Sequence, residues 1–152
     1  MVMAMAVLTA LALAACGEDE GASPTATASG ATKAEFVAAA NRICAKASAR
    51  LESAGRSFFA PAPSGEVPTE REFVEERVVP ILGGQLIDGI AALQAPPGDE
   101  ATVAAIVDAG RRGLAALRSD PESIKAEPGS AGDPLREFGD LGRAYGLRCS
   151  DG

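Results

Sequence analysis

Apolar and polar residues recur with a helical period over most of the chain after residue 32. In the first such segment, residues 33–54, apolar side chains return at steps of three and four, which places them on one face of an α-helix. Thr32 and Glu35 have the spacing of a capping box, and Gly55 supplies a stop. The expected buried face consists of Phe36, Ala40, Ile43, Ala47, Leu51 and Ala54, with Cys44 at its edge.

A second helix is expected over residues 70–93. Thr69 and Glu72 repeat the capping-box spacing at its start. Pro80 lies inside this run, and because proline lacks a backbone N–H and its ring clashes with the preceding turn, we expect a kink there. The expected buried side consists of Phe73, Val74, Val78, Val79, Leu82, Leu86, Ile90 and Leu93.

Two further helices complete the pattern. The third is expected over residues 100–118, and the fourth is a short helix with Asp133 as its N-cap, Pro134 in its first turn and Gly146 as a left-handed cap. The inward residues should be Val103, Ile106, Val107, Gly110, Leu114 and Leu117 in the third helix, and Leu135, Phe138, Leu141 and Tyr145 in the fourth.

This pattern predicts an all-α fold, because no strand-like alternation persists for more than a few residues. With loops at 55–68 and 119–132, we expect a four-helix bundle, up-down-up-down, with a kinked second helix. Phe58 and Phe59 fall in the first loop. We expect them to fold back on the core as a lid, and the alternative is an exposed apolar contact.

The N-terminal segment has a different character. Residues 1–15 are uncharged and almost wholly apolar, too short for a spanning helix of ~20 residues but suited to a signal peptide. The segment runs into LAACG at 13–17, which resembles a bacterial lipobox. That resemblance implies cleavage before Cys16 and a diacylglycerol on its thiol. The alternatives are a short secretory signal with an incidental cysteine, or a truncated membrane helix.

Residues 16–31 would then be the lipidated cysteine and a tether. The stretch after Cys16 holds three acidic residues followed by small and polar ones, and no large apolar side chain. Such a segment cannot bury enough surface to offset its chain entropy, so we expect disorder. Residues 32–152 are expected to form the single helical domain, since compact domains cluster near ~100–150 residues.

Lipidation of Cys16 leaves Cys44 and Cys149 as an even pair. In an exported chain such a pair indicates a disulfide, because the compartment outside the membrane is oxidising. The bridge would close a loop of about a hundred residues, which the chain-entropy model values at ~4.7 kcal/mol. The alternative is a pair of redox-active thiols, which the wide spacing disfavours.

Composition narrows the chemistry. The formal net charge of -7 argues against nucleic acid as a partner, and the absence of histidine excludes Ser-His-Asp and Cys-His catalysis. Weaker candidates are best read as solvated surface: a carboxylate cluster for a divalent cation, and the pair Arg111 and Arg112 for anionic lipid. The carboxylates are Glu70, Glu72, Glu75 and Glu76. We therefore expect no enzyme, no catalytic residue, no metal ion and no cofactor.

Three stretches, FVAAANRIC at 36–44, LQAPP at 93–97 and YGLRC at 145–149, carry a family resemblance. They are similar to uncharacterised actinobacterial lipoproteins and small secreted four-helix proteins. The resemblance covers about residues 33–149 and implies a bundle in which an early and a late cysteine pair. It implies no activity.

The function expected from these observations is a non-enzymatic interaction module. It would sit outside the cytoplasmic membrane, held there by the lipid on Cys16, and would meet an envelope protein or lipid. The alternative is a small carrier for a lipid or other apolar molecule between the helices. Its groove would be lined by Leu82, Leu86, Ile90 and Phe138.

Overall fold

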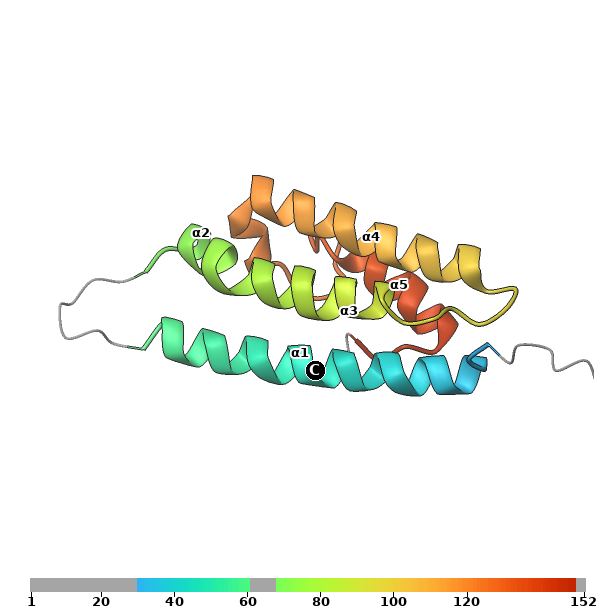
Figure 1. Cartoon of the computed structure of the whole chain (residues 1–152). Helices are drawn as coiled ribbons and strands as arrows, with labels where there is room; N and C mark the ends of the chain where they lie inside the picture. The colour runs from blue at the N-terminus through green and yellow to red at the C-terminus, as the bar shows by residue number, and fades with distance from the viewer. Residues whose placement is uncertain (1–29, 61–67, 150–152) are drawn as a thin grey trace, which may run out of the picture.

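The structure is a computed structural model that describes residues 30–60 and 68–149. This part of the chain is helical and holds no strand, as the hydrophobic pattern predicts (Figure 1). Four helical regions follow one another along it. They are α1 (Lys33–Phe58); α2 (Glu70–Phe73) continued by the π-helix η1 (Val74–Ile87) and α3 (Asp88–Ala91); α4 (Glu100–Ser119); and α5 (Arg136–Tyr145).

The predicted capping box begins α1. The backbone N–H of Thr32 donates to Glu35 Oε2 at 2.9 Å, and the Glu35 N–H donates to Thr32 Oγ1 at 3.2 Å. The predicted stop at Gly55 is wrong, because α1 continues for one more turn to Phe58. In this turn the ring of Phe58 lies 5.3 Å from that of Phe73, a contact that only the longer helix provides.

The second helical region also begins at its predicted capping box, at Thr69 and Glu72. Most of the region is π-helical, which the α-helical reading of the sequence misses, and Pro80 lies exposed within the π-helix. Four residues turn about 40° beyond one turn of an α-helix, whereas they fall short of one full turn of the wider π-helix. The strict step of four is Val74, Val78, Leu82, Leu86 and Ile90, all buried.

The π-helix also changes which residues face inward. Ile81 and Ile87, which the sequence pattern leaves outside the core, are 7% and 1% exposed. Val79 and Leu93, predicted to be buried, are only partly so.

The start of α5 differs from the prediction. Asp133 is not its N-cap: its carboxylate accepts hydrogen bonds from the backbone N–H groups of Gly129 (2.7 Å) and Leu135 (2.8 Å), and the helix begins at Arg136. Leu141 was expected to point inward but is 36% exposed. The buried face of α5 is narrow, because α5 packs mainly on α4, and it consists of Phe138, Gly142 and Tyr145.

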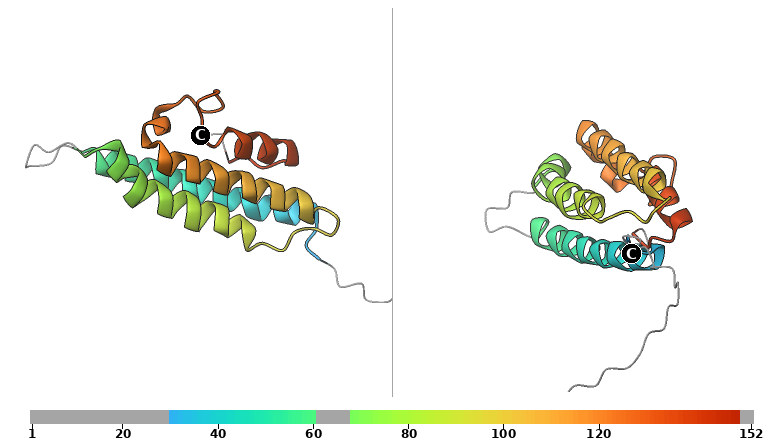
Figure 2. Two further views of the ribbon diagram at one scale, coloured as in Figure 1. Left: turned by 90° about the horizontal axis from the view of Figure 1, so that it is seen from above. Right: turned by 45° about the vertical axis from the view of Figure 1, so that its right-hand side comes forward.

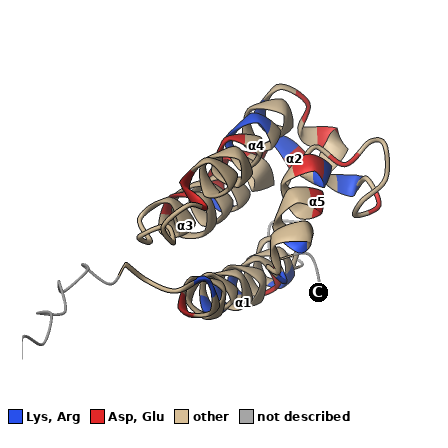
Figure 3. Cartoon of the chain, turned by 90° about the vertical axis from the view of Figure 1, so that its right-hand side faces the viewer, with Lys and Arg blue, Asp and Glu red and all other residues tan. Residues whose placement is uncertain are grey.

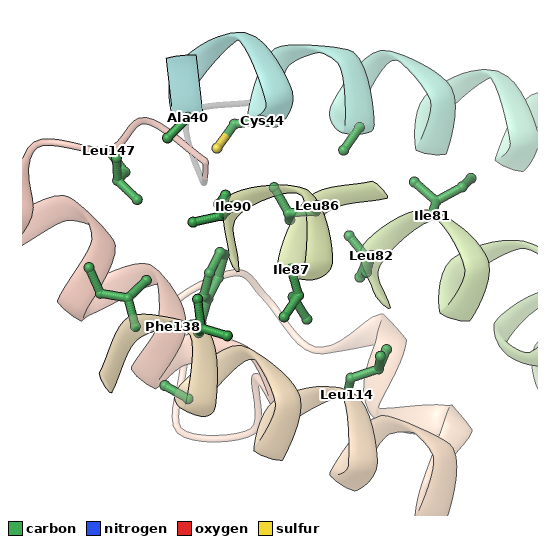
Figure 4. Close-up of a cluster of buried hydrophobic side chains, with 14 of the residues drawn as sticks. Ala40, Cys44, Ile81, Leu82, Leu86, Ile87, Ile90, Leu114, Phe138 and Leu147 are labelled. Atoms are coloured by element: carbon green, nitrogen blue, oxygen red, sulfur yellow. The ribbon is translucent and has the colours of Figure 1, made fainter. Parts of the chain in front are cut away.

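The core lies where these helices meet. The π-helix packs between α1 and α4, and α5 lies against α4 (Figure 2). Side chains from all four regions point toward one another in the close-up (Figure 4). Alanines and glycines allow this close approach, since a Cβ on Gly110 would sit 3.0 Å from Ile87 and 3.1 Å from Phe138.

Candidate functional site

The disulfide between Cys44 and Cys149 is present and joins the middle of α1 to the segment after α5. Its Cα atoms lie 4.8 Å apart, and Cys44 is 1% exposed, so its half of the bridge lies inside the core rather than at the core edge. Between α5 and the bridge, Leu147 is buried and the Arg148 N–H donates to Asn41 Oδ1 at 2.8 Å. The segment after α5 is therefore attached to α1 at two successive residues, Arg148 and Cys149.

A glycine directs the chain from α5 to this bridge. Gly146 has φ 110°, and its N–H donates to the carbonyl oxygens of Gly142 and Arg143. The Leu147 N–H also donates to Gly142, at 2.8 Å. These are the hydrogen bonds of a Schellman motif, so the predicted left-handed cap is confirmed.

The predicted lipidation residue, Cys16, lies outside the described residues, together with the predicted signal peptide 1–15 and most of the tether 16–31. Within residues 30–60 and 68–149, no helix is long and apolar enough to cross a membrane.

The four residues predicted to line an apolar groove lie in the packed core. Their exposed fractions are 7% for Leu82, 5% for Leu86, 1% for Ile90 and 5% for Phe138. Leu82 and Leu86 lie on the π-helix, Ile90 on α3 and Phe138 across from them on α5 (Figure 4). None of the four lines either of the two surface hollows described below.

The carboxylate cluster at the start of the second helical region is used in local contacts. Glu72 Oε2 accepts hydrogen bonds from the backbone N–H and the hydroxyl of Thr69, and these lower the pKa of the Glu72 carboxyl group. Glu70 pairs with Lys125 at 2.5 Å, and Arg71 pairs with Glu75 at 3.6 Å. The described residues contain no group of three or more His, Cys, Asp or Glu that could hold a metal ion.

Arg111 and Arg112 are likewise engaged. Arg112 pairs with Glu137 of α5 at 2.8 Å, and Arg111 lies 3.8 Å from Asp88 and 3.5 Å from Asp108. Arg111 also borders a hollow of about 400 Å³ between the π-helix and α4. The positive charge of Arg111 in this hollow is therefore offset by a neighbouring carboxylate, whereas Arg118, which also lines it, forms no ion pair among the described residues. Its lining consists of Val79, Pro80, Gly83, Gly84, Ile87, Asp88, Arg111, Leu114 and Arg118.

Tyr145 connects three helices. Its hydroxyl donates to Asp99 Oδ2 at 2.7 Å, and its ring meets Phe36 edge to face at 5.9 Å. Lys33 Nζ lies 4.1 Å from the ring centre. Burial, and then the hydrogen bond to Asp99, raise the pKa of Tyr145 to about 12. This tyrosine therefore remains a neutral hydrogen-bond donor over the whole physiological range.

Three phenylalanine rings gather where α1 ends and α2 begins. The ring centres of Phe58, Phe59 and Phe73 lie 5.0–5.4 Å apart. Phe73 is buried and Phe58 half-buried, whereas Phe59 is 44% exposed. Each of the two alternatives for this pair therefore holds for one residue. Phe58 packs on the core, and Phe59 exposes apolar surface to solvent.

A second hollow, of about 240 Å³, lies between α1 and the π-helix. Lys46 and Arg50 line it from α1, one helical turn apart, and Gln85 lines it from the π-helix. Gln85 Oε1 is buried without a hydrogen-bond partner among the described residues. Ile43 and Ala47 form the apolar part of the lining.

Sequence reasoning did not single out this second hollow. A signal was present, since Arg42, Lys46 and Arg50 recur at steps of four with no acidic residue between Glu35 and Glu52. Steps of four place them on one side of α1. Gln85 carries no such signal, because it joins these residues only through packing between two helices.

Comparison of this chain with known protein families, with curated proteins and with solved structures found no match. The resemblance to actinobacterial lipoproteins therefore stays a prediction, and the function must be inferred from the residues themselves.

Proposed function

We propose that this protein is a lipid-anchored interaction module of the cell envelope, without enzymatic activity. The observation that carries the proposal is the disulfide between Cys44 and Cys149, because such bridges persist in oxidising compartments outside the cytoplasm. The bridge also leaves Cys16 as the third cysteine, at the end of the apolar segment 1–15. The lipobox resemblance of residues 13–17 supports acylation at that position.

The proposed anchor is physically sufficient. Each buried acyl CH₂ adds about 0.8 kcal/mol of membrane affinity, so two or three chains hold a domain stably. Segment 17–31, which connects Cys16 to the helical domain, is long enough to hold that domain away from the bilayer surface. Fifteen residues reach at most ~50 Å when extended.

The substitution Cys16→Ser tests the anchor. Expressed in a bacterium that processes lipoproteins, the unaltered chain should partition with the membrane and carry the added mass of its acyl chains on intact-mass analysis. The serine variant should lose both, because its hydroxyl does not accept the diacylglycerol. Cys149→Ser serves as the matched control and should stay in the membrane fraction. An unaltered chain found soluble and without acyl mass would contradict the proposal.

The interaction role is tested at Phe59, the most exposed of the large apolar side chains described. A photo-crosslinking amino acid placed at residue 59 of the anchored protein in living cells should give a discrete adduct with an envelope protein. The same probe at Ala104, an exposed position on α4, is the control. If both positions give the same pattern, or neither gives an adduct, the module interpretation fails at this surface.

We further propose that the four helical regions run up-down-up-down and that the second is kinked at Pro80. Support comes from the course of the chain in Figures 1 and 2, where α1, the second region and α4 run side by side between opposite ends of the molecule and the shorter α5 lies beside part of α4. Proline inside a helix is the usual cause of a kink. Residual dipolar couplings measured for residues 74–91 would report two axis directions if the kink exists and one if it does not.

The carrier alternative has no observation in its favour, because its four proposed lining residues are buried in the packed core.

A further inference from the structure

One side of α1 carries positive charge that the described residues do not neutralise. Arg42, Lys46 and Arg50 are all exposed, and none lies within ion-pair distance of a described carboxylate. In contrast, Arg56 of the same helix pairs with Glu52 at 3.7 Å. Figure 3 shows the Lys and Arg positions along α1. This local excess of positive charge stands out in a chain with a net charge of -7.

The hollow between α1 and the π-helix lies on this basic side. Lys46 and Arg50 border it with a rise of ~6 Å between them along the helix. An ammonium and a guanidinium offer only donors, and both groups suit the acceptor oxygens of a phosphate. In the hollow on the other side of the π-helix, Arg111 already has Asp88 beside it, so that hollow holds one unpaired basic side chain, Arg118, instead of two.

Gln85 adds a second, independent observation. Its Oε1 is buried in this same region without a partner, and a buried acceptor without a donor is destabilising. A ligand hydroxyl in the hollow would supply the missing donor once the Gln85 side chain turns this oxygen, which is closed to solvent, toward the hollow that the residue lines. The volume of about 240 Å³ lies below the range of drug-sized pockets and suits a small polar group.

We propose that this hollow binds a phosphate ester with a neighbouring hydroxyl, of which a phosphoglycerol group is the simplest example. Lys46 and Arg50 bind the phosphate oxygens, Gln85 Oε1 accepts the hydroxyl hydrogen, and Ile43 and Ala47 contact the carbon chain. Either a lipid headgroup or a soluble phosphate ester carries this chemistry. The proposal goes beyond the anchored-module function and does not depend on lipidation.

The test is an NMR titration of the full chain carrying Cys16→Ser, which removes any effect of an anchor. Glycerol phosphate is the probe, and inorganic phosphate and glycerol are the comparators. We expect shifts at the amides of Lys46, Arg50 and Gln85, with glycerol phosphate binding more tightly than either comparator. No shift at these residues up to millimolar glycerol phosphate would overturn the proposal.

Charge variants separate a site from general attraction. Lys46→Gln and Arg50→Gln should each weaken binding about tenfold, since each removes a charge-assisted hydrogen bond. Arg118→Gln, an equal charge change beside the other hollow, should alter binding less than about twofold. An effect of Arg118→Gln as large as that of Lys46→Gln would refute a defined site. Unchanged far-UV circular dichroism verifies that each variant is folded.

Gln85→Met tests the hydroxyl contact. It should abolish the preference for glycerol phosphate over inorganic phosphate and should raise the melting temperature, because it removes a buried acceptor that has no partner. A preference that survives this variant would overturn the assigned role of Gln85.

Co-sedimentation with phosphatidylglycerol vesicles, compared with phosphatidylcholine vesicles, shows whether the ligand is a lipid headgroup or a soluble phosphate ester. Binding that depends on Lys46 and Arg50 supports a headgroup, and binding of the soluble probe alone supports a soluble ester.

Discussion

Tyr145 is a single residue on which contacts from α1, α4 and α5 converge. It lies on α5, its ring packs on Phe36 of α1, and its hydroxyl bonds to Asp99 at the start of α4. Asp99 occupies the N-cap position of α4, but its side chain makes no cap hydrogen bond and instead accepts from Tyr145. The hydrogen bond between Tyr145 and Asp99 therefore joins two helices through residues that lie 46 positions apart in the sequence.

The ionisation of Tyr145 should be visible directly, because the chain has one tyrosine and no tryptophan. Since burial favours the neutral phenol, the native protein should titrate with a pKa of about 12 in the tyrosinate absorbance band. The contribution to stability is complete below a pH of about 10, the ordinary pKa of tyrosine, and is lost as the pH rises toward 12. Urea unfolding at a series of alkaline pH values measures that loss.

Asp99→Asn is the companion variant. It removes the negative charge while keeping a hydrogen-bond acceptor, so the pKa of Tyr145 should fall but stay above its ordinary value, because burial is the larger cause. A native titration at the ordinary value in the unaltered chain would show that the ring is open to water and that this packing is wrong.

At the scale of helices, glycines set how closely neighbours approach. A Cβ on Gly113 of α4 would collide with the backbone carbonyl of Pro134 and come within 2.8 Å of Leu135. A Cβ on Gly84 of the π-helix would meet nothing within 4 Å. Gly113 is therefore required by close packing, whereas the position of Gly84 has space for a side chain.

Alanine substitution at these two positions should have opposite effects. Gly113→Ala should destabilise the fold by about 1–3 kcal/mol, because the segment before α5 would have to move away from α4. Gly84→Ala should stabilise it by about 0.5–1 kcal/mol, because alanine loses less backbone entropy in a helix. Urea denaturation followed by circular dichroism gives both values. Equal effects of the two changes would mean that α4 and the Pro134 segment are not in contact.

The helices were predictable from local signals, and their detailed packing was not. The capping boxes at Thr32 and Thr69 each lie within four residues of sequence, so the starts of α1 and α2 could be read directly. The end of α1 depends on a phenylalanine contact with a residue beyond the next loop. The burial of Ile81 and Ile87 depends on the π register.

The candidate site likewise has one part that the sequence predicts and another that depends on packing. The pair Cys44 and Cys149 followed from counting cysteines under the expectation that the chain is exported, and the structure joins them. The hollow beside Lys46 and Arg50 needs Gln85 from another helix, which no spacing rule connects to α1. The predicted groove residues failed for a related reason, because apolar periodicity alone marks a buried face whether that face is packed or hollow.

For the whole molecule, the bridge spans 105 residues and encloses every described helix but the first part of α1. The core of the domain is built largely from valine, isoleucine and leucine side chains, with Phe36, Phe73 and Phe138 as its buried phenylalanines. The disulfide, which restricts the unfolded chain, should therefore contribute a large share of the free energy of unfolding.

Reduction should lower the free energy of unfolding by about 2–5 kcal/mol, since the open chain gains the entropy of a loop of this length. The measurement is urea unfolding with and without a reducing agent. The double variant Cys44→Ala with Cys149→Ala is the control, because the reducing agent should leave its midpoint unchanged. A midpoint of the unaltered chain that does not move on reduction would show that the bridge is absent or without effect.

If the chain is exported as proposed, the position of the bridge sets an order of events during its translocation. Cys44 precedes Cys149 by the length of nearly the whole domain, so a chain threaded from its N-terminus delivers the first thiol long before its partner. In that interval the nearest other thiol is Cys16, twenty-eight positions earlier. Under the proposed anchoring, acylation converts that thiol to a thioether and withdraws it from exchange. Lipid attachment would then protect Cys44 from the wrong partner until α5 has emerged, and closing the ring would be the final step of maturation.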